Sequence, residues 1–143
     1  MQIVSVINQK GGVGKTTTVI NLAAGLSQLH KKILVIDLDP QGNATTGLGL
    51  SNIDNSSDTI YGVLNGTKEI GSVIKNTQFQ NLDIVTSNVD LSGLEVETAD
   101  DSNRAFILKT KLAAYLNNSR ALYDYVLIDC PPSLSLLTVM ALV

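Results

Sequence analysis

A glycine-rich loop near the start of the chain carries two lysines and two threonines. It consists of the consecutive residues Lys10, Gly11, Gly12, Val13, Gly14, Lys15, Thr16 and Thr17. Glycines let the backbone turn its N–H groups towards phosphate oxygens, and a helix beginning near Lys15 adds the positive end of its dipole. Lys15 would supply a charge for the β and γ phosphates, and Thr16 a hydroxyl for Mg²⁺. Because an apolar run precedes the loop and an amphipathic segment follows it, the pattern predicts a phosphate-binding loop.

The loop departs from the common pattern G-x-x-x-x-G-K-[ST] at its first position. Gln9 stands five positions before Gly14, where that pattern has a glycine. A second lysine, Lys10, stands at the start of the loop instead. It is either a solvated surface charge or a cation for a phosphate held by a facing subunit, and spacing alone leaves both open.

Two aspartates follow the apolar run Ile33–Ile36. Asp37 and Asp39 straddle one residue, so both carboxylates point the same way in extended geometry, and Pro40 then turns the chain out of the sheet. Carboxylates beside a phosphate site hold Mg²⁺ or orient an attacking water. The alternative is an ordinary strand-end turn, since such turns favour Asp before Pro.

A third aspartate ends the apolar run Tyr125–Ile128. An apolar strand that ends in a carboxylate, here Asp129, is the Walker B arrangement, in which the carboxylate reaches the metal ion. The neighbouring Cys130 is predicted to be a small buried residue and not a nucleophile, because no partnering base lies near it in the sequence.

The elements that position these groups alternate between strand and helix. Four apolar runs with little alternation are typical of strands covered by helices on both faces: Ile3–Ile7, Ile33–Ile36, Leu82–Val85 and Tyr125–Ile128. Helices are expected where apolar residues recur at helical spacing: 15–29, Arg104–Leu116 and Leu134–Val143, with shorter pieces at Thr59–Leu64, Glu69–Lys75 and Leu91–Glu97. The polar stretch Gln41–Asp58 has no periodicity and is interpreted as a long loop. The fold class is therefore α/β, a doubly wound, mostly parallel sheet of the P-loop NTPase type.

Composition narrows the class of protein further. The chain has 143 residues, a net charge of −3, ten dispersed basic residues and a single cysteine. It is long enough for one domain with a real core, and it has no basic stripe that would favour nucleic-acid binding. One cysteine excludes an internal disulfide, and no apolar run approaches the ~20 residues of a membrane helix. A cytoplasmic location is the default expectation.

These motifs together resemble the ParA/Soj family of partitioning ATPases. The segment Asn8–Thr17 is similar to the deviant Walker A motif of that family, Asp37–Asn43 to its second motif, Gly93–Glu97 to a further segment and Leu127–Ser133 to its Walker B region. The likeness runs along the whole chain. It covers about the first half of a typical family member, so residues 1–143 are expected to be the N-terminal part of a single P-loop ATPase domain. We expect the chain to stop after the Walker B strand and its following helix.

The resemblance implies ATP and Mg²⁺ as cofactors and a role for each motif residue. Lys10 to Thr17 would bind the nucleotide, with Lys10 reaching the partner's nucleotide across an ATP-dependent dimer, Lys15 binding phosphate and Thr17 contacting the α phosphate. Asp39 would position the attacking water, so Lys10, Lys15 and Asp39 are the implied catalytic residues. Thr16, Asp37 and Asp129 are the implied metal residues.

The family resemblance also implies partners and a function. Such proteins are slow ATP-hydrolysing dimerisation switches for chromosome or plasmid partitioning, bind nonspecific DNA and respond to a ParB-like centromere-binding protein. The DNA- and adenine-contacting residues would lie beyond Val143, in the missing half. In the family the first strand is central, so in this chain Ile3–Ile7 is expected to be an exposed sheet edge.

Two other functions share the deviant loop or the fold. A MinD-like membrane-positioning ATPase needs a C-terminal amphipathic helix, and the run Asp39-Pro40-Gln41 favours ParA over it. A metabolic enzyme that uses ATP to activate a small acid, similar to dethiobiotin synthetase, needs substrate-binding residues that the sequence does not reveal. A module whose ATP site only locks a dimer is the remaining alternative.

Overall fold

A mostly parallel sheet forms the centre of the computed structural model, which describes residues 1–7, 14–51, 56–118 and 123–143. The strands are β1 Gln2–Val6, β2 Ile33–Asp37, β3 Ile74–Asn76, β4 Leu82–Val85 and β5 Tyr125–Asp129. The α-helices are α1 Lys15–Gln28, α2 Asn43–Gly47, α3 Ile60–Leu64, α4 Ile70–Val73, α5 Leu94–Glu97, α6 Ile107–Asn118 and α7 Leu136–Leu142. Short 3₁₀ turns cover Ser56–Asp58, Val89–Gly93 and Arg104–Phe106.

The strand order is β1-β5-β2-β4-β3, and every pairing is parallel except that of β3 with β4. The last strand in sequence, β5, therefore lies between β1 and β2. This arrangement confirms the predicted α/β class and the four predicted strands, with ends shifted by a residue in three of them. Parallel strands need crossover connections, and the helices between them supply these.

The two faces of the sheet bury two separate apolar clusters. Alternate residues of β2 divide between them, with Leu34 and Ile36 in one cluster and Ile33 and Val35 in the other. All five residues of β2 are buried. A strand that packs on both faces needs apolar side chains in both directions, which explains the unbroken apolar runs in the sequence.

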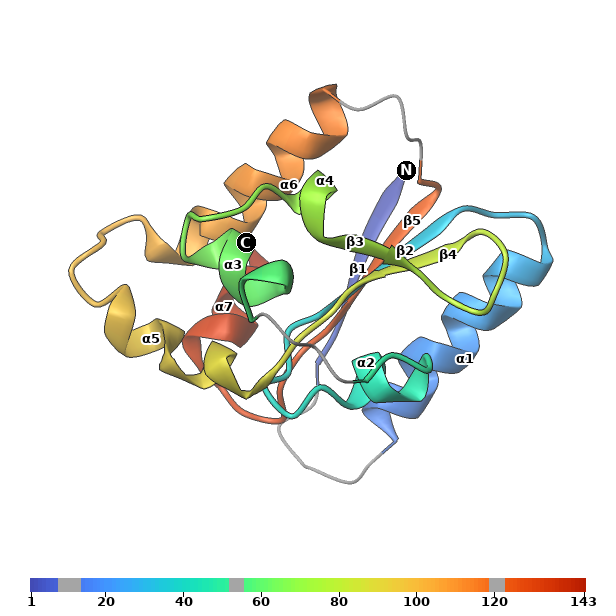
Figure 1. The fold of residues 1–143 in the computed structure, drawn as a ribbon, viewed down its shortest axis with the longest axis horizontal. Coiled ribbons are helices and arrows are strands. Elements are labelled where there is room, and N and C mark those ends of the chain that lie inside the picture. The colour runs from blue at the N-terminus through green and yellow to red at the C-terminus, as the bar shows by residue number, and fades with distance from the viewer. Residues whose placement is uncertain (8–13, 52–55, 119–122) are drawn as a thin grey trace.

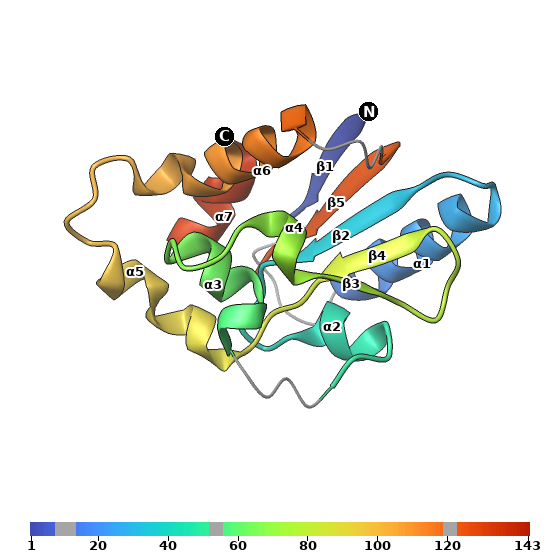
Figure 2. The ribbon, with the colours of Figure 1, turned by 45° about the horizontal axis from the view of Figure 1, so that its top comes forward.

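Helices cover the two faces unequally (Figures 1 and 2). Helix α1 lies on one face with α2 beside it, whereas α3, α6 and α7 lie on the other. Val19 and Ala23 of α1 are fully buried against the first face, and Leu108 and Leu112 of α6 are buried against the second. Leu108 and Leu112 are one helical turn apart, so they give α6 a single apolar side that faces the sheet.

Two sequence-based predictions were wrong in part. The helix expected over Glu69–Lys75 ends at Val73, and Ile74–Asn76 instead forms β3, which pairs with β4 and is itself the edge strand. Three residues are too short for a periodic signal, and the pairing satisfies backbone groups of β4 that would otherwise lie open. The stretch Gln41–Asp58 is not all loop, because α2 and a 3₁₀ turn form within it.

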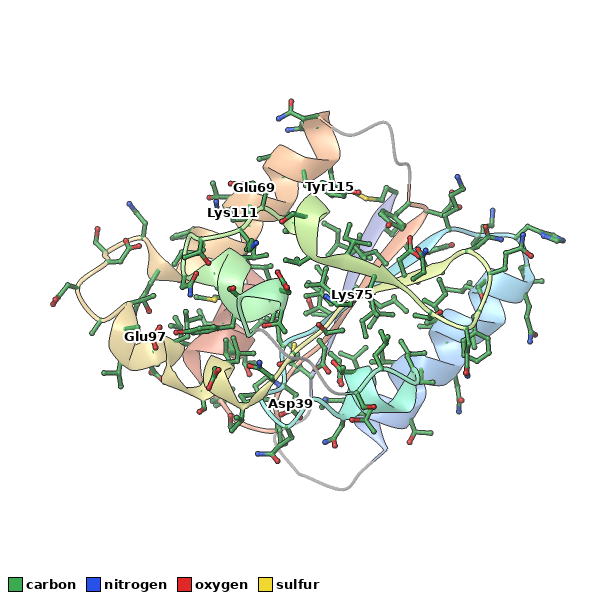
Figure 3. The ribbon with its side chains drawn as sticks, viewed as in Figure 1. Asp39, Glu69, Lys75, Glu97, Lys111 and Tyr115 are labelled. Atoms are coloured by element: carbon green, nitrogen blue, oxygen red, sulfur yellow. The ribbon has the colours of Figure 1, made fainter. Side chains whose placement is uncertain are left out.

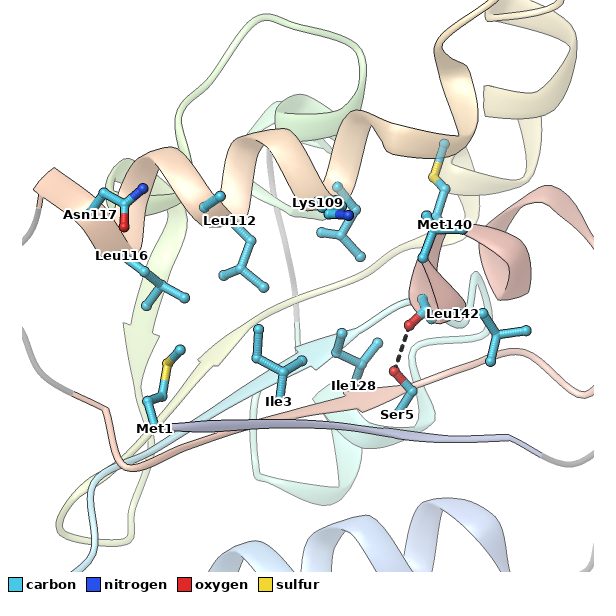
Figure 4. Close-up of a pocket in the computed structure, with 14 residues that line it drawn as sticks. Met1, Ile3, Ser5, Lys109, Leu112, Leu116, Asn117, Ile128, Met140 and Leu142 are labelled. Carbon is cyan, nitrogen blue, oxygen red and sulfur yellow. Dashed lines mark hydrogen bonds between the residues drawn. The ribbon is translucent and has the colours of Figure 1, made fainter.

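Strand β1 lies at the edge of the described sheet, as expected, and an apolar cavity of about 590 Å³ opens beside it (Figure 4). Ile3 of β1 faces Leu112 and Leu116 of α6 across this cavity. Ile3 is 49% exposed. The Ser5 hydroxyl donates to the Ala141 carbonyl at 2.8 Å and joins β1 to α7. Of the predicted site residues that the structure describes, none lines this cavity.

Candidate functional site

The carboxyl ends of the parallel strands bring the predicted acidic residues to one edge of the sheet. Asp37 ends β2 and Asp129 ends β5, and the register pairs these two residues as direct neighbours. Asp39 follows two positions after the end of β2. Ligands of open α/β sheets bind outside this edge, so the fold places the candidate groups where chemistry is expected.

Three predicted residues converge at the start of α1. The Lys15 ammonium group forms an ion pair with Asp129 Oδ1, and the Thr16 hydroxyl donates to Asp129 Oδ2 at 2.9 Å. In the sequence, Lys15 lies 114 positions from Asp129 and Thr16 lies 113 positions from it. The side chain of Lys15 is only 8% exposed and that of Asp129 is fully buried. One ammonium donor and one hydroxyl donor therefore each bind one oxygen of the same buried carboxylate.

Helix α1 begins at this point without a side-chain cap. Gly14 is its N-cap residue and has a φ of 83°, a conformation that glycine adopts at little cost. Within the described part of the chain no side-chain hydrogen bond caps this helix, and its first turn carries no acidic residue. An uncapped helix N-terminus beside a lysine and a threonine has the donors that an anionic phosphate group requires.

Part of the predicted loop lies outside the described residues. Lys10, Gly11, Gly12 and Val13 belong to that part, so the structure does not place the second lysine. Gly14 and Thr17 are described, and both are exposed at the start of α1.

Asp37 is fully buried and accepts three hydrogen bonds. Its Oδ1 accepts from the Asp39 N–H at 3.0 Å, and its Oδ2 accepts from the Thr45 N–H at 2.9 Å and the Thr45 hydroxyl at 2.7 Å. Burial raises the pKa of Asp37 from 3.8 to about 6, although the hydrogen bonds from Thr45 and Asp39 oppose this shift. The carboxylate thus organises the turn after β2 as well as lying beside Asp129.

The pKa of Asp37 predicts a specific dependence of stability on pH. As the pH falls through about 6, the folded chain takes up this proton, whereas the unfolded chain does so only near 3.8. The folded state then binds more protons, so the free energy of unfolding contributed by Asp37 should increase as the pH falls. Relative to an Asp37→Asn variant, the wild type should gain about 1–2 kcal/mol between pH ~7.5 and pH ~4.5.

Urea unfolding of both proteins across this pH range measures that difference. The Asp37→Asn variant is the matched control, because the other titrating groups contribute equally to both curves. A difference between the two proteins that stays constant with pH would contradict the raised pKa.

Asp39 lies in a tight turn that leads away from the sheet. The residue is 3% exposed, its Oδ1 accepts from the Gln41 N–H at 3.0 Å, and its carbonyl accepts from the Gly42 N–H at 2.8 Å. Figure 3 shows Asp39 at the strand ends, well away from the Glu69–Lys111 ion pair that joins α4 to α6. This position is consistent with a carboxylate that faces a ligand at the edge of the sheet.

The protein oxygens at this edge fit a Mg²⁺ ion that is also bound by the phosphates of a nucleotide better than one bound by protein groups alone. Among the residues that the structure describes, no group of three or more His, Cys, Asp and Glu side chains is placed to hold a metal ion. Mg²⁺ in phosphate-transfer sites is bound by one or two protein oxygens plus phosphates and water. Thr16 and Asp129, already in contact, provide two such oxygens beside the lysine.

Sequence reasoning missed the residues that connect this edge to its surroundings. Thr45 lies in the polar stretch interpreted as loop, and no local pattern marks it.

In the segment Gly93–Glu97, both oxygens of the Glu97 carboxylate accept from the Tyr61 hydroxyl, at 2.8 and 2.7 Å, while Leu94 is buried. That segment therefore anchors α5 to α3.

Cys130 is buried next to Asp129, as predicted. Burial raises the pKa of its thiol to about 12, with a smaller opposing effect of Lys15. A thiol that stays protonated at neutral pH is a poor nucleophile. The structure therefore supports a packing role for Cys130.

Known proteins are similar to this chain along nearly its whole length. The AAA domain family matches residues 1–143. The chain is 45% identical over 141 residues to the sporulation initiation inhibitor protein Soj of Bacillus subtilis, covering 99% of this chain and 54% of that protein. It is 47% identical over 141 residues to the chromosome partitioning protein ParA of Myxococcus xanthus, covering 99% and 48%. The chain thus spans about half the length of these curated relatives.

Solved structures share the fold as well. Cobyrinic acid a,c-diamide synthase from Mycobacterium smegmatis, with bound ATP analog and magnesium, matches with a TM-score of 0.89 and 37% identity over 99% of this chain and 56% of that one. A putative plasmid partition protein from Borrelia burgdorferi bound to AMPPNP matches with a TM-score of 0.81 and 34% identity over 99% and 57%. Both are complexes with ATP analogues.

In the described part of this chain, no helix has the length and apolar character needed to cross a membrane.

Proposed function

Because the chain belongs to the AAA domain family and is similar along its length to Soj and ParA, we propose that it is the N-terminal part of the P-loop domain of a partitioning ATPase. The observation that carries the proposal is the convergence of Lys15, Thr16 and Asp129 at the uncapped start of α1. The full protein would bind Mg-ATP, hydrolyse it slowly and use the two states as a dimerisation switch.

Each residue of the site has a role in this proposal. Lys15 binds phosphate, and Asp39 orients the attacking water. Thr16 would bind the Mg²⁺ ion, and the Asp129 carboxylate would lie in its outer shell. When bound, Mg-ATP supplies the phosphoryl group that is transferred to water, with the metal ion neutralising charge on the phosphates. Asp37, with both oxygens engaged by N–H and O–H donors, supports the metal shell through its neighbour Asp129 and the turn that carries Asp39.

The remaining nucleotide and partner contacts rest on the family likeness. Gly11, Gly12, Val13, Gly14 and Thr17 complete the phosphate loop, and Lys10 reaches the nucleotide of the second subunit in an ATP-dependent homodimer. The full protein would bind nonspecific DNA through the part of the relatives that this chain does not match, and it would respond to a ParB-like centromere-binding protein. The proposed location is the cytoplasm, on nucleoid DNA.

Calorimetry with Mg-ATP tests the proposal directly. The titration should be made on this chain and on the protein at the length of its relatives, followed by light scattering and DNA binding with ATP and with ADP. We expect the longer protein to bind ATP, to dimerise with ATP and to retain DNA only in that state. Failure of the longer protein to bind ATP would remove the site assignment, and the switch with it.

One competing function has a specific observation in its favour. The likeness to a solved cobyrinic acid a,c-diamide synthase, at a TM-score of 0.89, keeps open an ATP-dependent metabolic enzyme on this fold. ATP-dependent dimerisation and DNA retention distinguish the two, because an enzyme that activates a small acid requires neither. Turnover that depends on an added carboxylic acid would instead favour the enzyme.

A further inference from the structure

Thr45 joins three segments of the chain through one side chain and its own N–H. The hydroxyl and the backbone N–H both donate to Asp37 Oδ2, at 2.7 and 2.9 Å, and the hydroxyl oxygen accepts from the Ser87 N–H at 3.0 Å. Asp37 ends β2, Thr45 lies within α2, and Ser87 follows the end of β4. All three residues are at most 3% exposed.

The direction of these hydrogen bonds follows from chemistry. A buried carboxylate only accepts hydrogen bonds, so the single proton of the Thr45 hydroxyl points to Asp37. Its oxygen is then free to accept from Ser87, and this pairing satisfies the backbone N–H of a buried residue. Thr45 is therefore a bridge between Asp37 and the end of β4, and an apolar side chain of the same size would break both contacts.

The same carboxylate holds the residue proposed to orient water. Asp37 accepts from Thr45 with one oxygen and from the Asp39 N–H, at 3.0 Å, with the other. Beyond Asp39, the Gly42 N–H donates back to the Asp39 carbonyl at 2.8 Å, which closes the turn. A chain of hydrogen bonds thus runs from Ser87 through Thr45 and Asp37 to the backbone of Asp39.

Backbone packing supports the same connection. Gly42 adopts a φ of 66°, and a Cβ built on it would lie 3.3 Å from the Ser87 carbonyl oxygen. The turn after Asp39 therefore lies directly against the end of β4, with the Thr45 bridge beside it. A shift of Thr45 relative to Ser87 would move this turn and its carboxylate together.

We propose that Thr45 is a positioning residue for Asp39, holding the turn that carries this carboxylate to the end of β4 through Asp37 and Ser87. The proposal rests on the proposed ATPase function and deepens it. In this proposal Thr45 acts only through Asp39 and makes no contact of its own with the nucleotide or the attacking water. Its effect should therefore be on the rate of hydrolysis and not on the binding of ATP.

Steady-state ATP hydrolysis by the protein at the length of its relatives tests this role. The variants are Thr45→Val, which keeps the volume and loses the hydroxyl, and Thr45→Ser, which keeps the hydroxyl. Thr46→Val, at an exposed position of the same helix, is the matched control. We expect Thr45→Val to lower kcat at least about 10-fold with KM for ATP changed less than about twofold, because a small misplacement of a catalytic group is costly to the rate.

The serine variant distinguishes positioning from packing. Thr45→Ser should recover kcat to within about threefold of wild type, because the loss depends on the hydroxyl and not on the methyl group. A Thr45→Val enzyme with the kcat of Thr46→Val, or a Thr45→Ser enzyme as slow as Thr45→Val, would overturn the proposal. If Thr45→Val does not fold, as judged by its thermal melt, Thr45→Ala takes its place under the same criteria. A wild type without ATP hydrolysis would overturn the proposed function itself.

Discussion

Replacing Lys15 with methionine is expected to weaken Mg-ATP binding at least about 100-fold, the largest effect on ATP binding of any single change at the site. The lysine supplies the charge that a phosphate group meets at the start of α1, and charge-assisted contacts of this kind contribute most to anion binding. Calorimetry on the longer protein measures the change. Lys68→Met is the matched control, because Lys68 is 38% exposed and pairs with Asp58 away from the site.

The same substitution should also destabilise the fold. Lys15 neutralises the fully buried carboxylate of Asp129, and methionine would leave that charge without its cation. Removing one partner of a buried ion pair costs about 3–5 kcal/mol, and the retained Thr16 hydroxyl should keep the loss near the lower limit. Adding Asp129→Asn removes the stranded charge, so the double variant should recover most of the stability while still failing to bind ATP.

Urea unfolding of the single and double variants separates the two effects. If Lys15→Met binds Mg-ATP within threefold of wild type, the phosphate-binding role of Lys15 is wrong. If Asp129→Asn does not restore stability in the Lys15→Met background, the ion pair is not what Lys15 contributes to the fold.

Replacing Asp39 with asparagine should abolish most ATP hydrolysis while leaving ATP binding intact. An amide cannot accept the proton of an attacking water, and loss of such a group typically lowers the rate about 10²–10⁴-fold. Asparagine retains an oxygen that can accept from the Gln41 N–H, so the turn should persist. ATP turnover and calorimetry on the longer protein provide the two readouts.

Asp58→Asn serves as the control for Asp39→Asn. The side chain of Asp58 is 46% exposed and pairs with Lys68, so its loss should leave both turnover and ATP affinity near wild type. An Asp39→Asn protein that hydrolyses ATP at the wild-type rate would remove Asp39 from the mechanism. A protein that loses ATP binding instead would show that Asp39 has another role.

Much of the site was predictable from local patterns. Asp37 and Asp129 each follow a continuous apolar run, and such runs are typical of strands covered on both faces. Since parallel strands end at the same edge of a sheet, a parallel arrangement of these two strands is enough to bring the carboxylates to one edge. The loop between β1 and α1 was recognisable because its glycines, lysine and threonine occur in consecutive order.

The sequence by itself therefore determined the fold class, the four parallel strands and the residue types at the site, because these depend on local periodicity and on short motifs. Only the tertiary structure decided which distant groups meet: the Lys15–Asp129 ion pair, the Thr45 bridge from Asp37 to Ser87 and the pairing of β3 with β4. These contacts depend on the order β1-β5-β2-β4-β3 and on strand register. The physical reason is that strand order and register are selected by burial over the whole sheet, and no short segment contains that information.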